Sequence, residues 1–101
     1  MIENQAKFIQ YIEEHKDDLV KTLAEAVAIP SVSGDASYRP QVVKMGEWLE
    51  KQFQEAGAKT SMHSLGKQNL DGQEIDLPPV VYAQIGEDSK KKTVLVYGHY
   101  D

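Results

Sequence analysis

The first thirty residues place apolar side chains at the spacing of an amphipathic helix. Residues three or four apart share one face of a helix, and this face carries Phe8, Ile12, Leu19, Leu23 and Val27. The polar stretch 13–18 interrupts the pattern, and Asp17 could cap a second helix, so we allow a break or kink there. Pro30 ends the helix because a proline disfavours helical geometry at the residue before it.

A second amphipathic helix is predicted between Pro40 and Gly57. Proline suits the first turn, where its missing N–H needs no partner, and glycine suits the left-handed position that closes a helix. The apolar stripe between them consists of Val42, Met45, Leu49, Phe53 and Ala56, with Trp48 beside it. We assign these methionine and aromatic side chains to the core and not to a cofactor site.

Beyond Gly57 the apolar pattern changes to that of strands. We predict strands at about 59–65, 80–85 and 93–98, with a turn at Asp71-Gly72. The short loop between the last two strands favours an antiparallel hairpin. The near-continuous apolar run of 93–98 is typical of a strand covered on both faces. The expected fold class is therefore α/β, with two long helices packed on one face of a mixed sheet.

Composition and charge narrow the function. The 101 residues carry a net charge of −5, which argues against a nucleic-acid-binding protein, and we interpret the basic run 90–92 as a solvated turn. The chain has no cysteine, so a metal would need histidine and carboxylate ligands. We find neither a signal peptide nor an apolar run that could cross a bilayer, and we expect a cytoplasmic protein.

The most informative residues for chemistry are His99 and Asp101, at the end of the last predicted strand. Side chains alternate along a strand, so these two would point to one side and Tyr100 to the other. An aspartate beside a histidine can accept the proton of one ring nitrogen and leave the other free for a metal. The competing interpretation is a surface hydrogen bond at a strand end.

Other polar residues are weaker candidates. His15 lies in the charged stretch of a helix and His63 on a marginal strand, and we expect both to face solvent. Ser31 and Ser33 lie in a loop of turn formers, and no base is recognisable beside them. The sequence therefore gives no support to a serine nucleophile.

Several motifs in order resemble the N-terminal part of the M20 family of metallopeptidases, in particular the cytosolic nonspecific dipeptidases. That group includes the carnosine-dipeptidase-like and the fungal Cys-Gly dipeptidase-like enzymes. The motifs are Leu23-Ala24-Glu25-Ala26-Val27-Ala28-Ile29-Pro30-Ser31-Val32-Ser33, Leu65-Gly66-Lys67-Gln68 with Asp71-Gly72, Leu77-Pro78-Pro79, and Lys91 to Asp101.

The resemblance implies roles for two residues. His99 corresponds to the first ligand of a two-metal site that holds Zn²⁺ or Mn²⁺, and Asp101 to the carboxylate that orients it. The family hydrolyses dipeptides, such as Cys-Gly or Xaa-Gly, and dimerises through a smaller lid domain. Its other ligands, its glutamate base and the lid have no counterpart in these 101 residues.

Two hypotheses follow. The first is that residues 1–101 are the N-terminal segment of the catalytic domain of a cytosolic metallodipeptidase and are inactive alone. The second is a non-catalytic binding or structural module that retains the family's N-terminal fold. Under the first hypothesis we also expect an unstable or self-associating chain, because the last strand would lack its neighbours.

Overall fold

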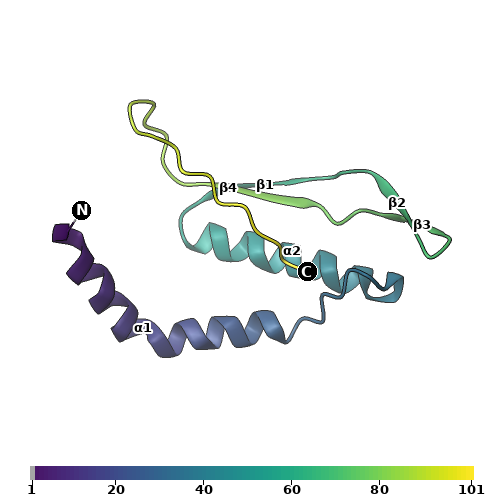
Figure 1. Ribbon diagram of the computed structural model, residues 1–101, viewed down its shortest axis with the longest axis horizontal. Helices are drawn as coiled ribbons and strands as arrows, with labels where there is room; N and C mark the ends of the chain where they lie inside the picture. The colour runs from purple at the N-terminus through teal and green to yellow at the C-terminus, as the bar shows by residue number, and fades with distance from the viewer. Residues whose placement is uncertain (1) are drawn as a thin grey trace.

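The computed structural model describes residues 2–101, with side chains from residue 4 onward, and it confirms an α/β chain. Two α-helices, one short 3-10 helix and four strands are present in this part of the chain. In order they are α1 (Ile2–Val27), η1 (Ala36–Tyr38), α2 (Arg39–Glu55), β1 (Lys59–His63), β2 (Lys67–Leu70), β3 (Gln73–Asp76) and β4 (Val80–Gln84) (Figure 1).

Helix α1 is continuous through the polar stretch where we allowed a break, and its axis bends part of the way along (Figure 1). It ends at Val27, shortly before Pro30, as predicted. The prediction that both helices pack on the sheet is wrong for α1, because its apolar face remains open and Leu23 is 64% exposed. A two-stranded sheet is only about 10 Å wide, so a single helix about 10 Å across suffices to cover one face.

Helix α2 is that covering helix, and it packs on both β1 and β4. Pro40 lies in its first turn, as predicted. Val42 is fully buried and Met45 is 8% exposed, so the predicted stripe does form the centre of the core. Towards the end of the helix the stripe reaches solvent, where Phe53 is exposed.

The end of α2 follows from the glycine that the sequence singled out. Gly57 has a φ of +92°, in the left-handed region that favours glycine. Its N–H donates to the carbonyl of Gln54 (3.0 Å), and the N–H of Ala58 donates to the carbonyl of Phe53 (2.9 Å). These two bonds form a Schellman motif, which satisfies carbonyls that the last helical turn leaves free.

Strands β1 and β4 form an antiparallel pair, in which Met62 lies opposite Val81 and Lys59 opposite Gln84. The predicted strands 59–65 and 80–85 are therefore present, but the predicted hairpin of 80–85 with 93–98 is wrong. The strand pairs of residues 2–101 are both antiparallel, so the described sheets are not mixed either.

Strands β2 and β3 form an antiparallel hairpin, and neither strand was predicted from the sequence. The turn between them was predicted, and Asp71 (φ 52°) and Gly72 (φ 82°) both adopt the positive φ of a type I′ turn. Leu70 lies opposite Gln73 across this turn. Both strands are mostly polar, so their sequences show no clear apolar alternation. The Asp-Gly turn was the one local indication of a hairpin here.

The whole chain is elongated. Its radius of gyration is 17.0 Å, against about 13 Å for a compact domain of this length. Its accessible surface is 8436 Å², against roughly 5,700 Å² for a monomeric protein of its mass. No helix described within residues 2–101 combines the length and the apolar character needed to cross a bilayer.

Candidate functional site

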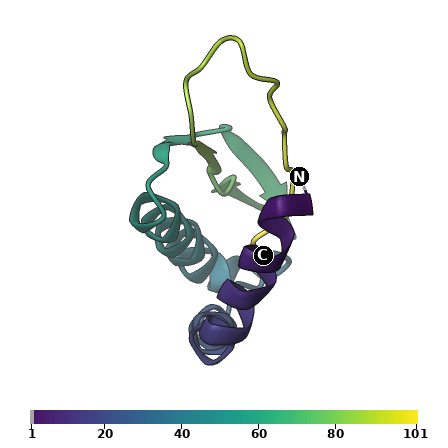
Figure 2. The same ribbon diagram turned by 90° about the vertical axis from the view of Figure 1, so that its left-hand side faces the viewer.

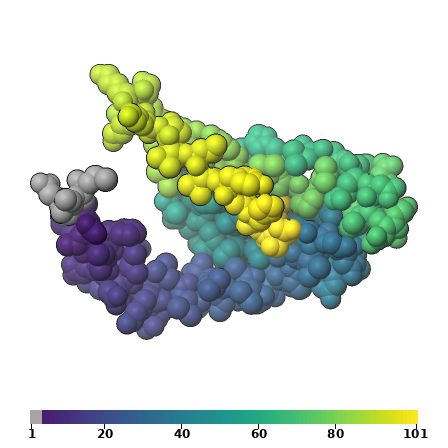
Figure 3. All heavy atoms as spheres, in the orientation of Figure 1, coloured from purple at the N-terminus to yellow at the C-terminus, as the bar shows by residue number. Residues whose placement is uncertain are grey.

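The C-terminal segment, residues 85–101, leaves β4 as a wide loop and returns across the surface (Figures 2 and 3). Residues 94–97 are between 84% and 87% exposed and belong to no strand, so the predicted strand 93–98 is wrong. An apolar run forms a strand only where a neighbouring backbone accepts its hydrogen bonds. The expected neighbour, β4, pairs with β1 along one edge, and within residues 2–101 no strand pairs along its other edge.

Tyr100 attaches the end of this segment to the rest of the fold. Its hydroxyl donates to the carbonyl of Pro79 (2.6 Å), just before β4. Its ring lies against α2 at Gly46, where an added Cβ would come within 3.2 Å of the tyrosine oxygen. The pKa of Tyr100 is raised above its usual value, first by burial and then by the charge of Asp101.

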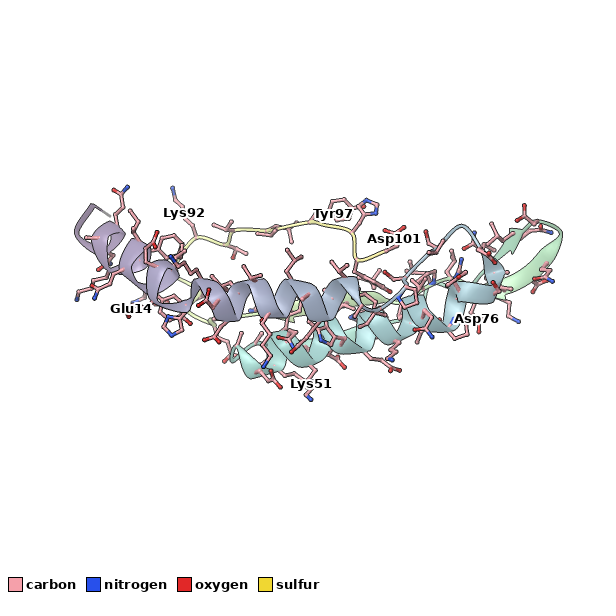
Figure 4. All side chains as sticks on the ribbon, turned by 90° about the horizontal axis from the view of Figure 1, so that it is seen from below. Glu14, Lys51, Asp76, Lys92, Tyr97 and Asp101 are labelled. Carbon is pink, nitrogen blue, oxygen red and sulfur yellow. The ribbon has the colours of Figure 1, made fainter. Side chains whose placement is uncertain are left out.

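His99 and Asp101 lie beside each other and exposed, whereas the Tyr100 side chain is turned towards α2, so the predicted alternation is present even without a strand. The His99 side chain is 73% exposed and that of Asp101 is 39% exposed. His99 Nδ1 and Asp101 Oδ1 are 3.5 Å apart, which is longer than a formed hydrogen bond. Asp101 lies at the end of the extended segment, beyond Tyr97 (Figure 4).

Ser33 is a polar contact of Asp101 that no sequence pattern predicted. Its hydroxyl donates to Asp101 Oδ2 at 2.6 Å, across 68 positions of sequence. This bond is the largest cause that lowers the pKa of Asp101 below its usual value, with smaller contributions from His99. The Ser31 hydroxyl makes a longer contact, 3.4 Å, to the carbonyl oxygen of Tyr100. Both serines lie in the Pro30-Ser31-Val32-Ser33 motif of the family resemblance, and no local pattern identified their partners.

Arg39 fixes the loop that carries Ser33. Its side chain is 8% exposed, and Nη2 donates to the carbonyl of Ser33 at 3.0 Å. Nη1 donates to Gln68 Oε1 (3.1 Å) and to the carbonyl of Asp76 (2.5 Å) on the β2–β3 hairpin. One guanidinium therefore joins the loop before α2 to this hairpin.

The second ring nitrogen of His99 faces outward. Nε2 lies 3.3 Å from the hydroxyl of Tyr97, which is itself exposed, and the two rings meet edge to face at 5.5 Å. An imidazole with Nδ1 towards a carboxylate, and with only an exposed hydroxyl beside Nε2, suits one ligand position of a metal site. Within the described residues, no group of three histidine or carboxylate side chains could complete such a site.

The other two histidines make polar contacts within their own elements. His63 is exposed, as predicted, and its Nε2 lies 2.8 Å from the Ser61 hydroxyl. His15 is half-buried and not fully solvent-facing, because its ring stacks on Tyr11 at 3.9 Å. His15 Nδ1 also lies 2.8 Å from the carbonyl of Tyr11.

Comparison with known proteins finds close relatives, although no family model matches the chain. A Cys-Gly metallodipeptidase of Schizosaccharomyces pombe is 44% identical over 95 residues, which cover 94% of this chain and 20% of the relative. A Cys-Gly metallodipeptidase of Candida albicans is 45% identical over 93 residues (89% and 19%). A Beta-Ala-His dipeptidase of Homo sapiens is 40% identical over 98 residues (94% and 19%).

These relatives confirm the resemblance to metallodipeptidases that the sequence motifs indicated. They also define its extent, because the chain spans about a fifth of the length of the curated relatives that it matches. The similarity extends over nearly the whole of this chain, so it includes the loop that carries Ser33.

Proposed function

We propose that this chain is the N-terminal segment of the catalytic domain of a metal-dependent dipeptidase, of the M20 type, and that His99 supplies one metal ligand. The observation that carries the proposal is the 44% identity to a metallodipeptidase over 94% of the chain. The placement of His99, with an exposed side chain and Nδ1 beside a carboxylate, supports it.

In this proposal Asp101 acts on His99 and does not bind the metal. A carboxylate at Nδ1 favours the tautomer that carries its proton there, which leaves the lone pair of Nε2 for the metal. The present 3.5 Å separation needs only a small adjustment of the exposed ring to become a hydrogen bond. The Tyr97 hydroxyl would have to leave Nε2 when a metal binds.

A bound Zn²⁺ or Mn²⁺ pair would supply an activated water for attack on a peptide carbonyl. The remaining ligands and the general base would come from sequence outside residues 1–101. The proposed substrates are dipeptides such as Cys-Gly or β-Ala-His, after the names of the relatives. We further propose a cytoplasmic protein that dimerises through a lid domain. On this account the 101-residue chain alone is inactive.

The test is hydrolysis of Cys-Gly and β-Ala-His by the purified protein that contains this segment, before and after chelation and metal return. Loss of activity on chelation and its recovery with Zn²⁺ or Mn²⁺ are expected. His99→Ala should lower the activity at least about a hundredfold, because even the partners of metal ligands contribute about tenfold to a hundredfold. His63→Ala is the matched control and should leave the activity unchanged. Full activity of the His99→Ala variant would overturn the proposal.

The alternative is a non-catalytic binding or structural module. Calorimetric titration of the 101-residue chain with Zn²⁺ distinguishes it from the dipeptidase segment. A single histidine is a poor metal site, since zinc sites in proteins use three or four ligands. We therefore expect weak binding of Zn²⁺ that disappears in the His99→Ala variant. Tight, stoichiometric binding by this chain alone would favour a self-contained module.

A further inference from the structure

The two carboxylate oxygens of Asp101 have different neighbours. Oδ1 faces Nδ1 of His99 at 3.5 Å, and Oδ2 accepts a hydrogen bond from the hydroxyl of Ser33 at 2.6 Å. The serine contact is the shorter of the two and comes from a loop far away in sequence. The orientation of the carboxylate is therefore set from the Ser33 side.

We propose that Ser33 is a positioning residue, whose hydroxyl holds the Asp101 carboxylate so that its other oxygen selects the Nδ1–H tautomer of His99. That this tautomer leaves Nε2 free for a metal matters only if the proposed function holds. The tautomer preference of His99 does not depend on the proposed function. Ser33 would touch neither metal nor substrate, and it would act through Asp101 alone.

The hydroxyl of Ser33 can act in this way because its backbone is anchored. The buried Arg39 guanidinium donates to the Ser33 carbonyl, and it is itself held by Gln68 and the Asp76 carbonyl. A free surface serine would lose rotamer entropy on binding a carboxylate and would gain little. Here the Ser33 backbone is already held in place, so the bond to Asp101 costs only the rotational freedom of the serine side chain.

The end of the chain is anchored from the opposite side. The hydroxyl of Tyr100 donates to the Pro79 carbonyl, and its ring packs on Gly46, so the backbone between His99 and Asp101 is held against α2. Asp101 and Ser33 are thus brought together by two independently fixed elements. Figure 3 shows the end of the C-terminal segment in contact with the residues that follow α1.

The direction of the hydrogen bonds follows from charge. An ordinary carboxyl group is ionised at about pH 8, so the Asp101 carboxylate can only accept hydrogen bonds there. Ser33 must then be the donor at Oδ2, and a neutral His99 ring that faces Oδ1 must present N–H at Nδ1. Nε2 is left as an acceptor, which agrees with the Tyr97 hydroxyl beside it.

The test is ¹⁵N NMR of the His99 ring in protein labelled at histidine, without metal, at about pH 8, where an ordinary histidine is neutral. The unsubstituted protein should show the Nδ1–H tautomer in excess. Ser33→Ala should lower the ratio of Nδ1–H to Nε2–H about threefold to tenfold. Ser33→Thr keeps the hydroxyl and should restore most of the ratio.

Ser31→Ala is the matched control, because Ser31 contacts a backbone carbonyl and not the carboxylate. It should leave the tautomer ratio unchanged. Asp101→Asn serves as a second variant at an exposed position and should change the ratio at least as much as Ser33→Ala. Backbone amide shifts of β1 and β4 report whether each variant is folded.

Unchanged ring shifts in a folded Ser33→Ala variant would overturn the inference, and so would an equal change in Ser31→Ala. If Ser33→Ala fails to fold, an unchanged ratio in Asp101→Asn overturns it instead. The readout needs neither metal nor hydrolysis. A failure of the dipeptidase proposal therefore leaves this test intact, and a failed tautomer test leaves the dipeptidase proposal standing.

Discussion

Arg39 is a charged residue in the buried part of the chain, and its guanidinium is surrounded by neutral hydrogen-bond acceptors. Three of its hydrogen bonds go to Ser33, Gln68 and Asp76, while its Nε is buried without a partner among the described residues. Neutral acceptors replace water around the guanidinium, which keeps its charge at any ordinary pH. The side chain therefore acts as a cross-link between a loop and a hairpin.

Replacement of Arg39 by methionine tests this cross-link. Arg39→Met keeps much of the volume but leaves the carbonyls of Ser33 and Asp76 without their donor, so we expect the free energy of unfolding to fall by about 1.5–3 kcal/mol. Urea denaturation followed by circular dichroism measures the change. Lys44→Met, at an exposed position of α2, is the control and should stay within about 0.5 kcal/mol. Equal stability of the two variants would contradict the cross-link.

At the scale of elements, turn chemistry decides where α2 and the β2–β3 hairpin end. Gly57 closes the helix in a left-handed conformation, and Asp71-Gly72 close the hairpin with two positive φ values. Both were visible in the sequence, because few residues adopt these angles without strain. What the sequence did not show was which strand would pair with β4.

The Gly57→Ala variant measures how much the left-handed conformation at the end of α2 contributes to the free energy of unfolding. An added Cβ at Gly57 meets no atom within 4 Å, so any loss of stability comes from the φ of +92° and not from a clash. We expect the free energy of unfolding to fall by about 1–2 kcal/mol. Gly34→Ala, also in open space but without a positive φ, should be neutral or slightly stabilising. Thermal melts of both variants measure the difference, and a neutral Gly57→Ala would refute the account of this helix end.

At the scale of the whole molecule, the main feature is apolar surface without cover. Helix α1 leaves Leu19, Leu23 and Val27 exposed, and the C-terminal segment does the same with residues 94–97. The accessible surface is about 2,700 Å² larger than expected for a monomeric protein of this mass. Exposed apolar side chains gathered on one segment are typical of surfaces that are covered by further protein.

We therefore expect the 101-residue chain to self-associate in solution. Sedimentation velocity should show a weight-average mass that rises with concentration, and a Leu23→Gln, Leu95→Gln double variant should reduce this rise. Lys16→Gln and Lys92→Gln, at exposed polar positions of the same two segments, form the control pair. A monomer at every concentration tested would contradict the expectation.

Part of the candidate site could be predicted from local sequence patterns, and part depends on contacts between residues far apart in the sequence. His99 and Asp101 became candidates through their spacing, because alternation along an extended chain places residues two apart on one side, and the family resemblance suggested their roles. Ser33 was not, since its contact with Asp101 spans 68 positions and no local rule connects them. The role of Arg39 was missed for the same reason, as its partners lie in three separate segments.

The sequence by itself determined the two helices, the ends of α2, the turn at Asp71-Gly72, and the strands that became β1 and β4. Each depends on periodicity or on a φ preference within a few residues. Only the tertiary structure decided that β4 pairs with β1, that 93–98 stays outside the sheet, and that α1 leaves its apolar face open. Those outcomes depend on which surfaces are present to cover an apolar segment, and hydrophobic attraction has no direction that a local pattern could encode.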